Sequence, residues 1–294
     1  MLNASIDYKV ELDSDVADDV SQALIDKRED LTQMLSLLAK EADTVIAYTP
    51  NECAEATTKA RKETQQVEEA LRRILQDLRL RRTEDYRGLY SGKISARRLY
   101  RAGYGDKRVF QRRERPGEIN MAVCLLMDLS GSMIDTRPLI EQVVVALCDA
   151  FQKEKLEFIA LGYSGHGHIA YISRLHDREA GKVYLDLDRS KAWDMTPSYE
   201  GLAAAIAQLL RLGGNKPKVL FHCTDGNPDK PGMHAIPDLL NNARNKGIMD
   251  IHIAMGWNIS SGKFRDIYGE VVPISDISQL PTVIEKKLRD KLGI

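Results

Sequence analysis

The sequence predicts an α/β fold in which a doubly wound, mostly parallel β-sheet is preceded by an α-helical hairpin. Two observations carry this prediction. From residue 119 onward, short apolar runs alternate with helical patterns, as in βαβ crossovers. Before residue 83, apolar residues recur every three or four positions, as in amphipathic helices. The 294 residues suffice for one α/β domain and a smaller helical part.

The helical part is expected to cover residues 1–82. A first helix is predicted from Asp13 to about Ala47, with an interruption near Arg28. A second helix is predicted to begin at Pro50, because Thr49 and Glu52 form a capping-box pattern. Its apolar seam consists of Cys53, Ala56, Ala60, Thr64, Val67, Leu71, Ile74 and Leu78. We expect the two helices to pair as an antiparallel hairpin; the seam would also suit a partner helix or a homo-oligomer.

Residues 83–118 form a basic connector in which Gly, Arg and Tyr alternate, with one short helix expected from Ser95 to Arg101. The net charge of −1 conceals a marked asymmetry. Residues 1–71 carry 7 basic and 16 acidic side chains, whereas residues 72–115 carry 15 basic and 5 acidic ones. The favoured interpretation is a solvated or protein-docking segment, and nucleic-acid binding through interleaved Arg and Tyr stays open.

The predicted α/β domain covers residues 119–294. Strands are expected at Met121–Met127, Glu157–Tyr163, Val219–Thr224 and Ile248–Met255, and helices at Leu139–Lys153, Tyr199–Leu212, Met233–Asn245 and Ile277–Leu292. Ile169–Ile172 is predicted to form an antiparallel edge hairpin with the second strand, and Val271–Ile274 the last strand. Ligands of such sheets bind at the carboxyl ends of the strands.

Polar side chains follow three of these apolar segments. Asp128, Ser130 and Ser132 come directly after the first strand, Thr196 precedes a helix, and Asp225 follows the strand Val219–Thr224. Hydroxyl and carboxylate oxygens are hard ligands, which suit Mg²⁺ or Mn²⁺ rather than zinc. The sequence therefore predicts a Mg²⁺ (or Mn²⁺) site; the alternative is that the hydroxyls only cap turns and helices.

The order DxSxS, Thr, Asp on strand-end loops resembles the metal-ion-dependent adhesion site of von Willebrand factor A (vWA) domains. By this resemblance, Ser130, Ser132 and Thr196 coordinate the metal directly or through water. Asp128 and Asp225 then act largely through water and by orienting hydroxyls. In this family a carboxylate from a partner fills the remaining coordination position.

A finer resemblance covers roughly Val67 to the end of the chain. The helix Val67–Leu80, the step Gly92-Lys-Ile-Ser-Ala-Arg97-Arg98-Leu99, the basic run Val109-Phe110-Gln-Arg112-Arg113 and then DLSGSM are similar to the CobT subunit of aerobic cobaltochelatase. This resemblance implies a non-ATPase vWA adaptor, with Arg97, Arg98, Arg112 and Arg113 as expected partner-binding residues.

The implied partners are a CobS-like AAA+ ATPase and a large chelatase subunit that inserts Co²⁺ into a tetrapyrrole in cobalamin biosynthesis. One alternative is a vWA cofactor of a MoxR-type AAA+ remodelling ATPase. An alternative of another class is a nucleic-acid-binding or structural scaffold protein that uses the Arg/Tyr-rich connector. A homo-oligomer is compatible with each of these.

Other features narrow the function. With 43% hydrophobic and 29% charged residues and no long apolar stretch or signal sequence, we expect a cytoplasmic protein without a membrane partner.

The four cysteines are expected to be free thiols, mostly buried. His166 and His168 are interpreted as surface-loop residues and His222 and His252 as core residues. No Ser/His/Asp or Cys/His arrangement is recognisable, so no catalytic residue is predicted and the chain is not expected to be an enzyme by itself.

Overall fold

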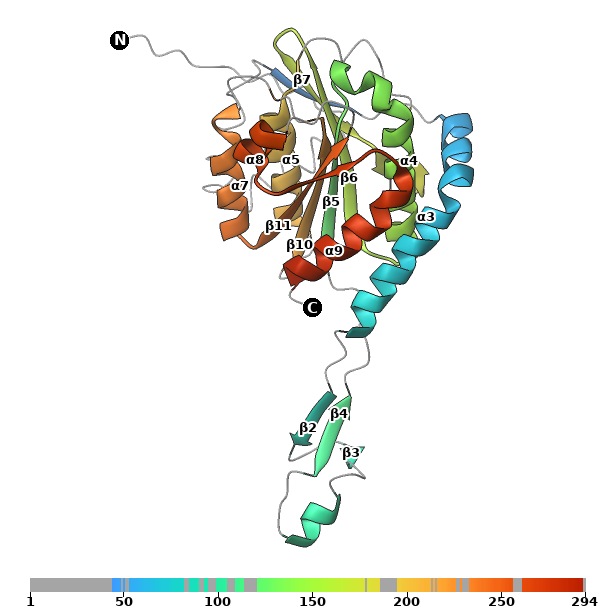
Figure 1. Ribbon diagram of the computed structural model, residues 1–294, viewed down its shortest axis with the longest axis vertical. Helices are drawn as coiled ribbons and strands as arrows, with labels where there is room; N and C mark the ends of the chain where they lie inside the picture. The colour runs from blue at the N-terminus through green and yellow to red at the C-terminus, as the bar shows by residue number, and fades with distance from the viewer. Residues whose placement is uncertain are drawn as a thin grey trace, which may run out of the picture.

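The computed structural model describes residues 44–48, 50, 53–81, 85–89, 93–94, 99–104, 109–113, 121–177, 179–185, 195–212, 214, 216–225, 228, 233–255 and 261–292. Figure 1 shows their arrangement around one large sheet. The first predicted helix falls outside these residues up to residue 43. Its pairing with the second helix therefore stays a prediction.

The central feature is a seven-stranded sheet with the order β1-β7-β6-β5-β10-β11-β12. All neighbouring pairs are parallel except β6 and β7, which are antiparallel. The strands are β1 (Thr44–Tyr48), β5 (Ala122–Asp128), β6 (Glu157–His166), β7 (Ile169–Arg174), β10 (Lys218–Thr224), β11 (Ile248–Met255) and β12 (Val271–Ile274). The predicted mostly parallel α/β sheet is confirmed.

Helices cover both faces of this sheet (Figure 1). One face carries α3 (Ala54–Arg81), α4 (Arg137–Lys153) and α9 (Leu280–Leu292), and the other carries α5 (Ser198–Arg211), α7 (Ile236–Asn245) and α8 (Ser261–Tyr268). Short elements between them are the 3₁₀ helices η2 (Gly131–Thr136) and η4 (Ile277–Gln279) and the strands β8 (His176–Asp177) and β9 (Lys182–Val183). Of the helices in this part of the chain, α8 is the one that the hydrophobic pattern does not predict.

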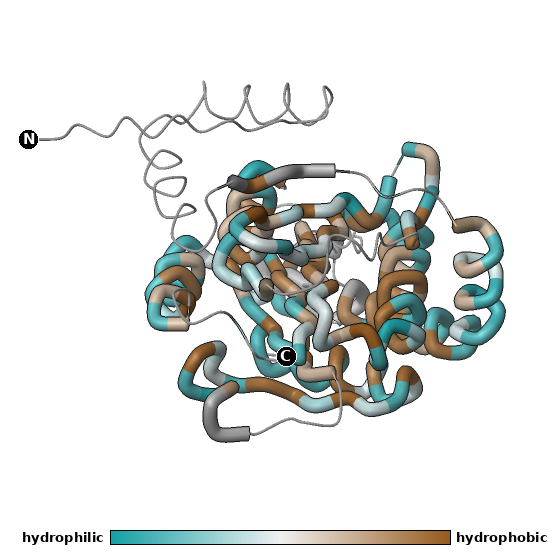
Figure 2. The backbone as a smooth tube through the Cα atoms, turned by 90° about the horizontal axis from the view of Figure 1, so that it is seen from above, coloured by the Kyte–Doolittle hydropathy of each residue, from teal (hydrophilic) through white to brown (hydrophobic). Residues whose placement is uncertain are grey.

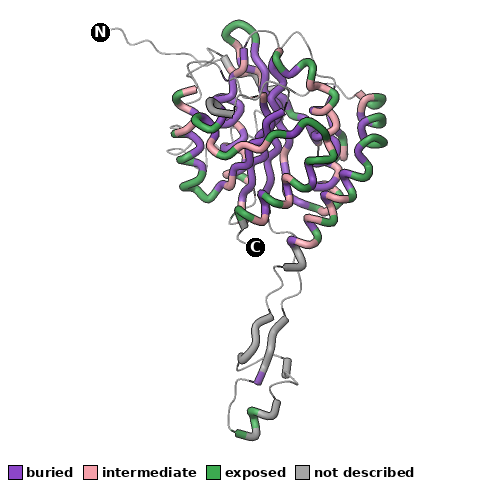
Figure 3. The backbone as a smooth tube through the Cα atoms, viewed as in Figure 1, coloured by how far each residue is buried: buried purple, intermediate pink, exposed green. Residues whose placement is uncertain are grey.

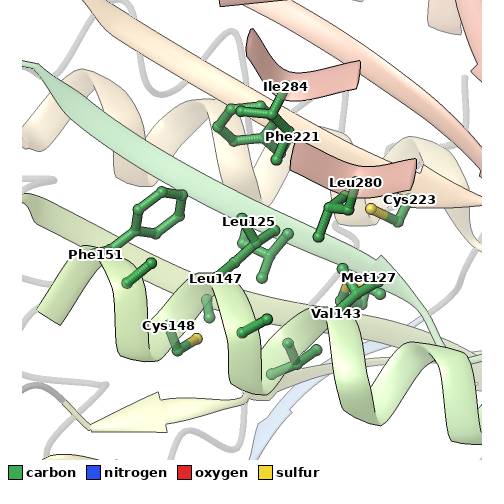
Figure 4. Packing of buried hydrophobic residues seen from close by; sticks show 14 of the residues in the cluster. Leu125, Met127, Val143, Leu147, Cys148, Phe151, Phe221, Cys223, Leu280 and Ile284 are labelled. Atoms are coloured by element: carbon green, nitrogen blue, oxygen red, sulfur yellow. The ribbon is translucent and has the colours of Figure 1, made fainter. Parts of the chain in front are cut away.

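Each face of the sheet has its own hydrophobic core. Figure 4 shows Leu125 and Phe221 of the sheet packed against Leu147 of α4 and Ile284 of α9. Hydrophobic segments gather in the middle of the domain (Figure 2), and the central strands are buried along almost their whole length (Figure 3). This two-sided burial is the reason that β5 and β10 read as continuous apolar runs rather than as alternating patterns.

The segment Thr44–Tyr48 is a strand and not the end of a helix, so the predicted extent of the first helix is wrong there. The β-branched residues Thr44, Val45 and Ile46 favour an extended backbone, and β7 offers them an open sheet edge. As a result β7 is not the edge strand that the sequence predicted, because β1 pairs with it in parallel.

Helix α3 confirms the second predicted helix but begins at Ala54 rather than at Pro50. Its apolar seam packs on α4 and α9 in the core of the α/β domain, with Ala60, Val67, Leu71 and Leu78 buried. Leu75, which the predicted seam does not include, is buried as well, whereas Ile74 is only partly buried. Ion pairs flank this contact, among them Arg61 with Asp149 and Arg72 with Glu154. The seam that was expected to serve a helical hairpin therefore serves the α/β domain.

The connector contains β-structure that the sequence did not predict. Strands β2 (Asp85–Leu89), β4 (Phe110–Arg113) and β3 (Lys93–Ile94) form an antiparallel sheet in that order, drawn beyond the end of α3 in Figure 1. In place of the helix expected at Ser95–Arg101, a 3₁₀ helix, η1, covers Leu99–Tyr104, and residues 95–98 lie outside the described part. Strand β4 covers most of the basic run Val109–Arg113.

A buried histidine on the α4 side of the sheet predicts a pH dependence of stability. Burial lowers the pKa of His176, whose ring lies 4.6 Å from that of Phe158, from 6.5 to about 4. Between pH 6.5 and 4, His176 therefore binds a proton in the unfolded state but not in the folded state, so the free energy of unfolding falls as the pH falls. The expected slope is at most about 1.4 kcal/mol per pH unit for this group.

Denaturant unfolding of the wild type and of His176→Gln at several pH values between 7 and 4 measures this slope. Groups that do not interact with His176 titrate equally in both proteins and cancel in the comparison. A wild type whose stability changes with pH no more steeply than that of the variant would contradict the assignment.

Candidate metal centre

The first component of the site is Asp128, the last residue of β5. Its side chain is fully buried, and both of its carboxylate oxygens contact donors. Oδ1 accepts a hydrogen bond from the backbone N–H of Ser130 at 2.9 Å, and Oδ2 accepts one from Thr224 Oγ1 at 2.6 Å. The hydroxyl of Tyr163 lies 3.1 Å from Oδ2. These contacts fix the carboxylate at the carboxyl end of the strand.

The second component is a pair of hydroxyls on the loop after β5. Ser130 Oγ and Ser132 Oγ lie 3.1 Å apart, and Ser130 is buried whereas Ser132 is exposed. The 3₁₀ helix η2 holds the loop, with the N–H of Met133 donating to Ser130 O at 3.0 Å. Adjacent ligands of an octahedral Mg²⁺ at about 2.1 Å from the ion are about 3 Å apart, so this separation suits two direct ligands.

The third component is Asp225, which follows β10 directly and is half-buried. Burial in the first place, and then the negative charge of Asp225, raises the pKa of Asp128 from 3.8 to about 6. Hydrogen bonds from Ser130 and Thr224 oppose this rise. The predicted neighbours Asp128 and Asp225 are therefore close enough to repel each other, and a divalent cation between them would relieve the repulsion.

The last predicted ligand, Thr196, is half-buried on the loop that leads into α5. The carbonyl of Thr196 accepts a hydrogen bond from the N–H of Ser198 at 2.7 Å. Ser198 Oγ in turn donates to the hydroxyl of Tyr163 at 3.3 Å, and Tyr163 contacts Asp128. The loop of Thr196 is thus joined to the other two strand-end loops through Ser198 and Tyr163.

The chemistry of these side chains fits a hard divalent ion. Three of the five offer hydroxyl oxygens and two offer carboxylates, which are the donors that Mg²⁺ and Mn²⁺ prefer. Among the described residues there is no group of three or more His, Cys, Asp and Glu side chains placed to hold a metal ion.

Sequence reasoning missed Tyr163, Thr224 and Ser198, which all contact the site. One signal was available for Tyr163: it occupies the carboxyl end of the strand beside β5 and is the register partner of Asp128. Thr224 immediately precedes Asp225, and its side chain projects from the same face of the sheet as Asp128. The hydrogen bonds themselves depend on the packing of three strands and are not visible in the sequence.

The remaining residues singled out from the sequence lie outside this site or outside the described residues. Arg97 and Arg98 lie outside the described residues, and Arg112 and Arg113 belong to β4. His166 is the last residue of β6 and His168 lies on the turn that follows it; both are exposed, as expected. His222 and His252 are buried, hydrogen-bonded core residues, also as expected. Cys124, Cys148 and Cys223 are buried free thiols, and Cys53 is a half-buried one.

Several solved structures are similar to this chain. Proximal thread matrix protein 1 from the mussel byssus matches with 18% identity and a TM-score of 0.44, over 57% of this chain and 46% of the mussel protein. The pilus adhesin SpaC from Lactobacillus rhamnosus GG matches with 11% identity and a TM-score of 0.41, over 58% and 30%. The SpRpn10 VWA domain matches with 15% identity and a TM-score of 0.41, over 54% of this chain and 93% of that domain.

The chain thus spans about half the length of the mussel protein and less of the adhesin. No protein-family model and no curated protein matches the sequence. The strand order and the helices on both faces make a mostly parallel α/β fold, and a VWA domain is among the structures to which this fold is similar. None of the helices in the described ranges combines the length and the apolar character that a membrane crossing requires.

Proposed function

We propose that this chain binds Mg²⁺ (or Mn²⁺) at Asp128, Ser130, Ser132, Thr196 and Asp225 and, through that ion, a carboxylate of a partner protein. The observation that carries the proposal is the pair of serine hydroxyls 3.1 Å apart, beside two carboxylates close enough to repel each other. Within the proposal, the bound ion supplies one open coordination position for an anionic oxygen.

The proposed role of each residue in the site follows from its position and its chemical group. Ser130, Ser132 and Thr196 are the proposed direct ligands, since hydroxyl oxygens neutralise little of the ion's charge and leave it attractive to an anion. Asp128 is held by Ser130 and Thr224 and provides the buried negative charge behind the ligands. Asp225 provides a second charge from the end of β10.

A partner has access to one side of this site. Asp128 is fully buried, Thr196 and Asp225 are half-buried, and Ser132 is exposed, so the donors run from the interior to the surface. Two residues after Ser132, the side chain of Ile134 is 44% exposed, which is unusual for a large apolar residue in the described part of this chain.

The partner that we propose is a AAA+ ATPase, and the chain is its non-ATPase adaptor. The sequence resemblance to CobT supports this choice and makes a CobS-like motor and metal insertion into a tetrapyrrole the favoured setting. A MoxR-type ATPase is the alternative. In either setting the expected role is mechanical: movement of the motor reaches the adaptor through the carboxylate contact at the metal.

Binding of the purified chain to a purified CobS-like or MoxR-like ATPase, with Mg²⁺ and with EDTA, tests this proposal. We expect EDTA to abolish binding and Ser132→Ala to weaken it at least about tenfold, because a lost ligand loosens the ion that joins the two proteins. Thr58→Ala removes an exposed hydroxyl from α3 and is expected to change nothing. Binding that survives both EDTA and Ser132→Ala would refute the adaptor mechanism.

A further inference from the structure

A chain of hydrogen-bonding contacts leads from Asp128 into the core of the domain. Its four contacts have heavy-atom separations between 2.8 and 3.1 Å. In order they join Asp128 Oδ2 to Tyr163 Oη, Tyr163 Oη to His222 Nε2, His222 Nδ1 to His252 Nδ1, and His252 Nε2 to Asp250 Oδ2. The outer end is held by Arg244, whose Nε and Nη2 donate to the two oxygens of Asp250 at 2.9 and 2.5 Å.

The members of this chain come from four strands but project from one face of the sheet, the face that α5, α7 and α8 cover. Tyr163, His222, His252 and Asp250 are all at most 4% exposed. The ring of Tyr268 from α8 lies 5.2 Å from the rings of both histidines. A Cβ added at Gly201 of α5 would lie 2.5 Å from the ring of Tyr163. The rings are thus enclosed, and their positions are fixed by packing.

The residues of these four contacts have one hydrogen too few to make a hydrogen bond at every contact. Four contacts need four hydrogens, whereas a tyrosine and two neutral histidines supply three. The single hydrogen of the Tyr163 hydroxyl is shared between two acceptors, His222 Nε2 at 3.0 Å and Asp128 Oδ2 at 3.1 Å. Ser198 Oγ donates to the same hydroxyl at 3.3 Å and adds no acceptor. The state of the two histidines must therefore decide which acceptor receives the tyrosine hydrogen.

Asp250 sets the state of the histidines. Burial alone would raise the pKa of Asp250, but hydrogen bonds from His252 and Arg244 hold it well below its ordinary value, so the group is a carboxylate. A carboxylate requires a hydrogen on His252 Nε2. Because burial lowers the pKa of both histidines, the rings are neutral, and His252 then presents a bare Nδ1. His222 must place its hydrogen on Nδ1, which leaves its Nε2 bare toward Tyr163.

We propose that Tyr163, His222, His252 and Asp250 form a buried relay in which the charge of Asp250 turns the Tyr163 hydrogen away from Asp128, making Tyr163 a positioning residue for the metal site. In this state Thr224 still donates to Asp128 Oδ2, Tyr163 does not, and the carboxylate keeps its charge for the ion. The part of the inference that concerns metal rests on the proposed function, whereas the tautomers of the histidines do not.

Removing the charge of Asp250 reverses the relay. In Asp250→Asn we expect the amide oxygen to take the place of Oδ1 and keep the hydrogen bond from Arg244 Nε, while the amide nitrogen replaces Oδ2 and donates to His252 Nε2. Arg244 Nη2 then loses its acceptor, His252 carries its hydrogen on Nδ1, and His222 carries its hydrogen on Nε2. Tyr163 then donates to Asp128 Oδ2 and competes with the ion for that charge. The variant changes one oxygen to nitrogen, far along the chain of contacts from the proposed ligands, and yet is expected to weaken metal binding.

Ring ¹⁵N chemical shifts of the histidines test the relay without any metal. In the metal-free wild-type protein at neutral pH we expect His252 as the Nε2–H tautomer and His222 as the Nδ1–H tautomer, and both reversed in Asp250→Asn. Asp238→Asn, an exposed substitution on α7, is the control and should leave both tautomers unchanged. The opposite tautomers in the wild type would overturn the relay, even if the Asp250 variant does not fold.

Titration with Mn²⁺ tests the link to the metal site. We expect Asp250→Asn to weaken Mn²⁺ binding about tenfold in the wild-type background and less than about twofold in a Tyr163→Phe background, where no hydroxyl is left to transmit the change. Equal effects in both backgrounds would refute transmission through Tyr163. A wild type that binds no Mn²⁺ would refute the proposed metal site, while the ring shifts would still decide the relay.

Discussion

Asp128→Ala is expected to abolish the stabilisation of this protein by Mg²⁺. A ligand that binds the folded state alone, at about one hundred times its dissociation constant, stabilises by about 2.7 kcal/mol. Asp128 is the buried charge behind the proposed ligands, so its removal should reduce this gain to nearly zero. Chemical denaturation with Mg²⁺ and with EDTA measures the gain as the difference between the two free energies of unfolding.

The same substitution has a second effect that does not involve metal. Ser130 N–H and Thr224 Oγ1 both lose the acceptor that they have in the wild type, in a place where Asp128 is fully buried. Leaving a buried donor unsatisfied costs about 1–3 kcal/mol. We therefore expect Asp128→Ala to be less stable than the wild type in EDTA as well, and Asp128→Asn, which keeps the shape and one acceptor oxygen, to separate the two effects.

Asp135→Ala is the matched control for this experiment. Asp135 is an exposed acidic residue of η2, close in sequence to the proposed ligands. Its loss should leave the gain from Mg²⁺ intact. The assignment of Asp128 would be contradicted if Asp128→Ala kept the full gain, or if Asp135→Ala lost as much of it.

Leu71→Ala is expected to destabilise the whole α/β domain by about 2–5 kcal/mol, the usual cost of removing a buried leucine side chain. Leu71 lies in the middle of α3, is 2% exposed and belongs to the same hydrophobic core as Leu147 of α4 and Leu288 of α9. The reason for the large effect is that α3 completes a face of the sheet's core instead of pairing with a separate helix.

Gln66→Ala, an exposed substitution on the same helix, should change stability by less than about 0.5 kcal/mol. Denaturant unfolding, followed both by a probe of the core and by the helical signal, measures the stability of the two variants. A single, shifted transition for Leu71→Ala is the expected result. Two separate transitions, with the α/β domain unaffected, would mean that α3 is not part of this core.

The α/β domain was predictable because most of its strands and helices have a recognisable pattern in the local sequence. The strands β5 and β10 are buried on both faces and consist mostly of apolar residues, and each is followed at once by polar residues. The Asp128 loop and the Asp225 loop lie at the same edge of the sheet because β5 and β10 are parallel neighbours. Sequence order and strand polarity alone were enough for that placement.

The errors arose where tertiary contacts overrule local pattern. Thr44–Tyr48 continues the three-or-four spacing of the residues before it, but pairing with β7 makes it a strand. The seam of α3 is compatible with any apolar partner, and its spacing does not say which one it meets. In the connector, β2 pairs with β4 across more than twenty residues, a long-range contact that no local window contains.

The polar chain behind Asp128 was hidden for a related reason. His222 and His252 were recognisable as core residues, since each lies within an apolar strand. Their mutual contact follows from the register of β10 and β11, in which they are direct partners. The contact of His222 with Tyr163 requires the tyrosine ring to reach across β5, and nothing in the spacing of these residues indicates it.

Anomalous scattering from a crystal of the full chain grown with Mn²⁺ locates the ion directly. A single strong peak at about 2.2 Å from both Ser130 Oγ and Ser132 Oγ, on the side of Asp128 and Asp225, is the result expected here. A map with no peak within reach of these two hydroxyls, at a Mn²⁺ concentration that fills sites elsewhere on the protein, would contradict the metal centre.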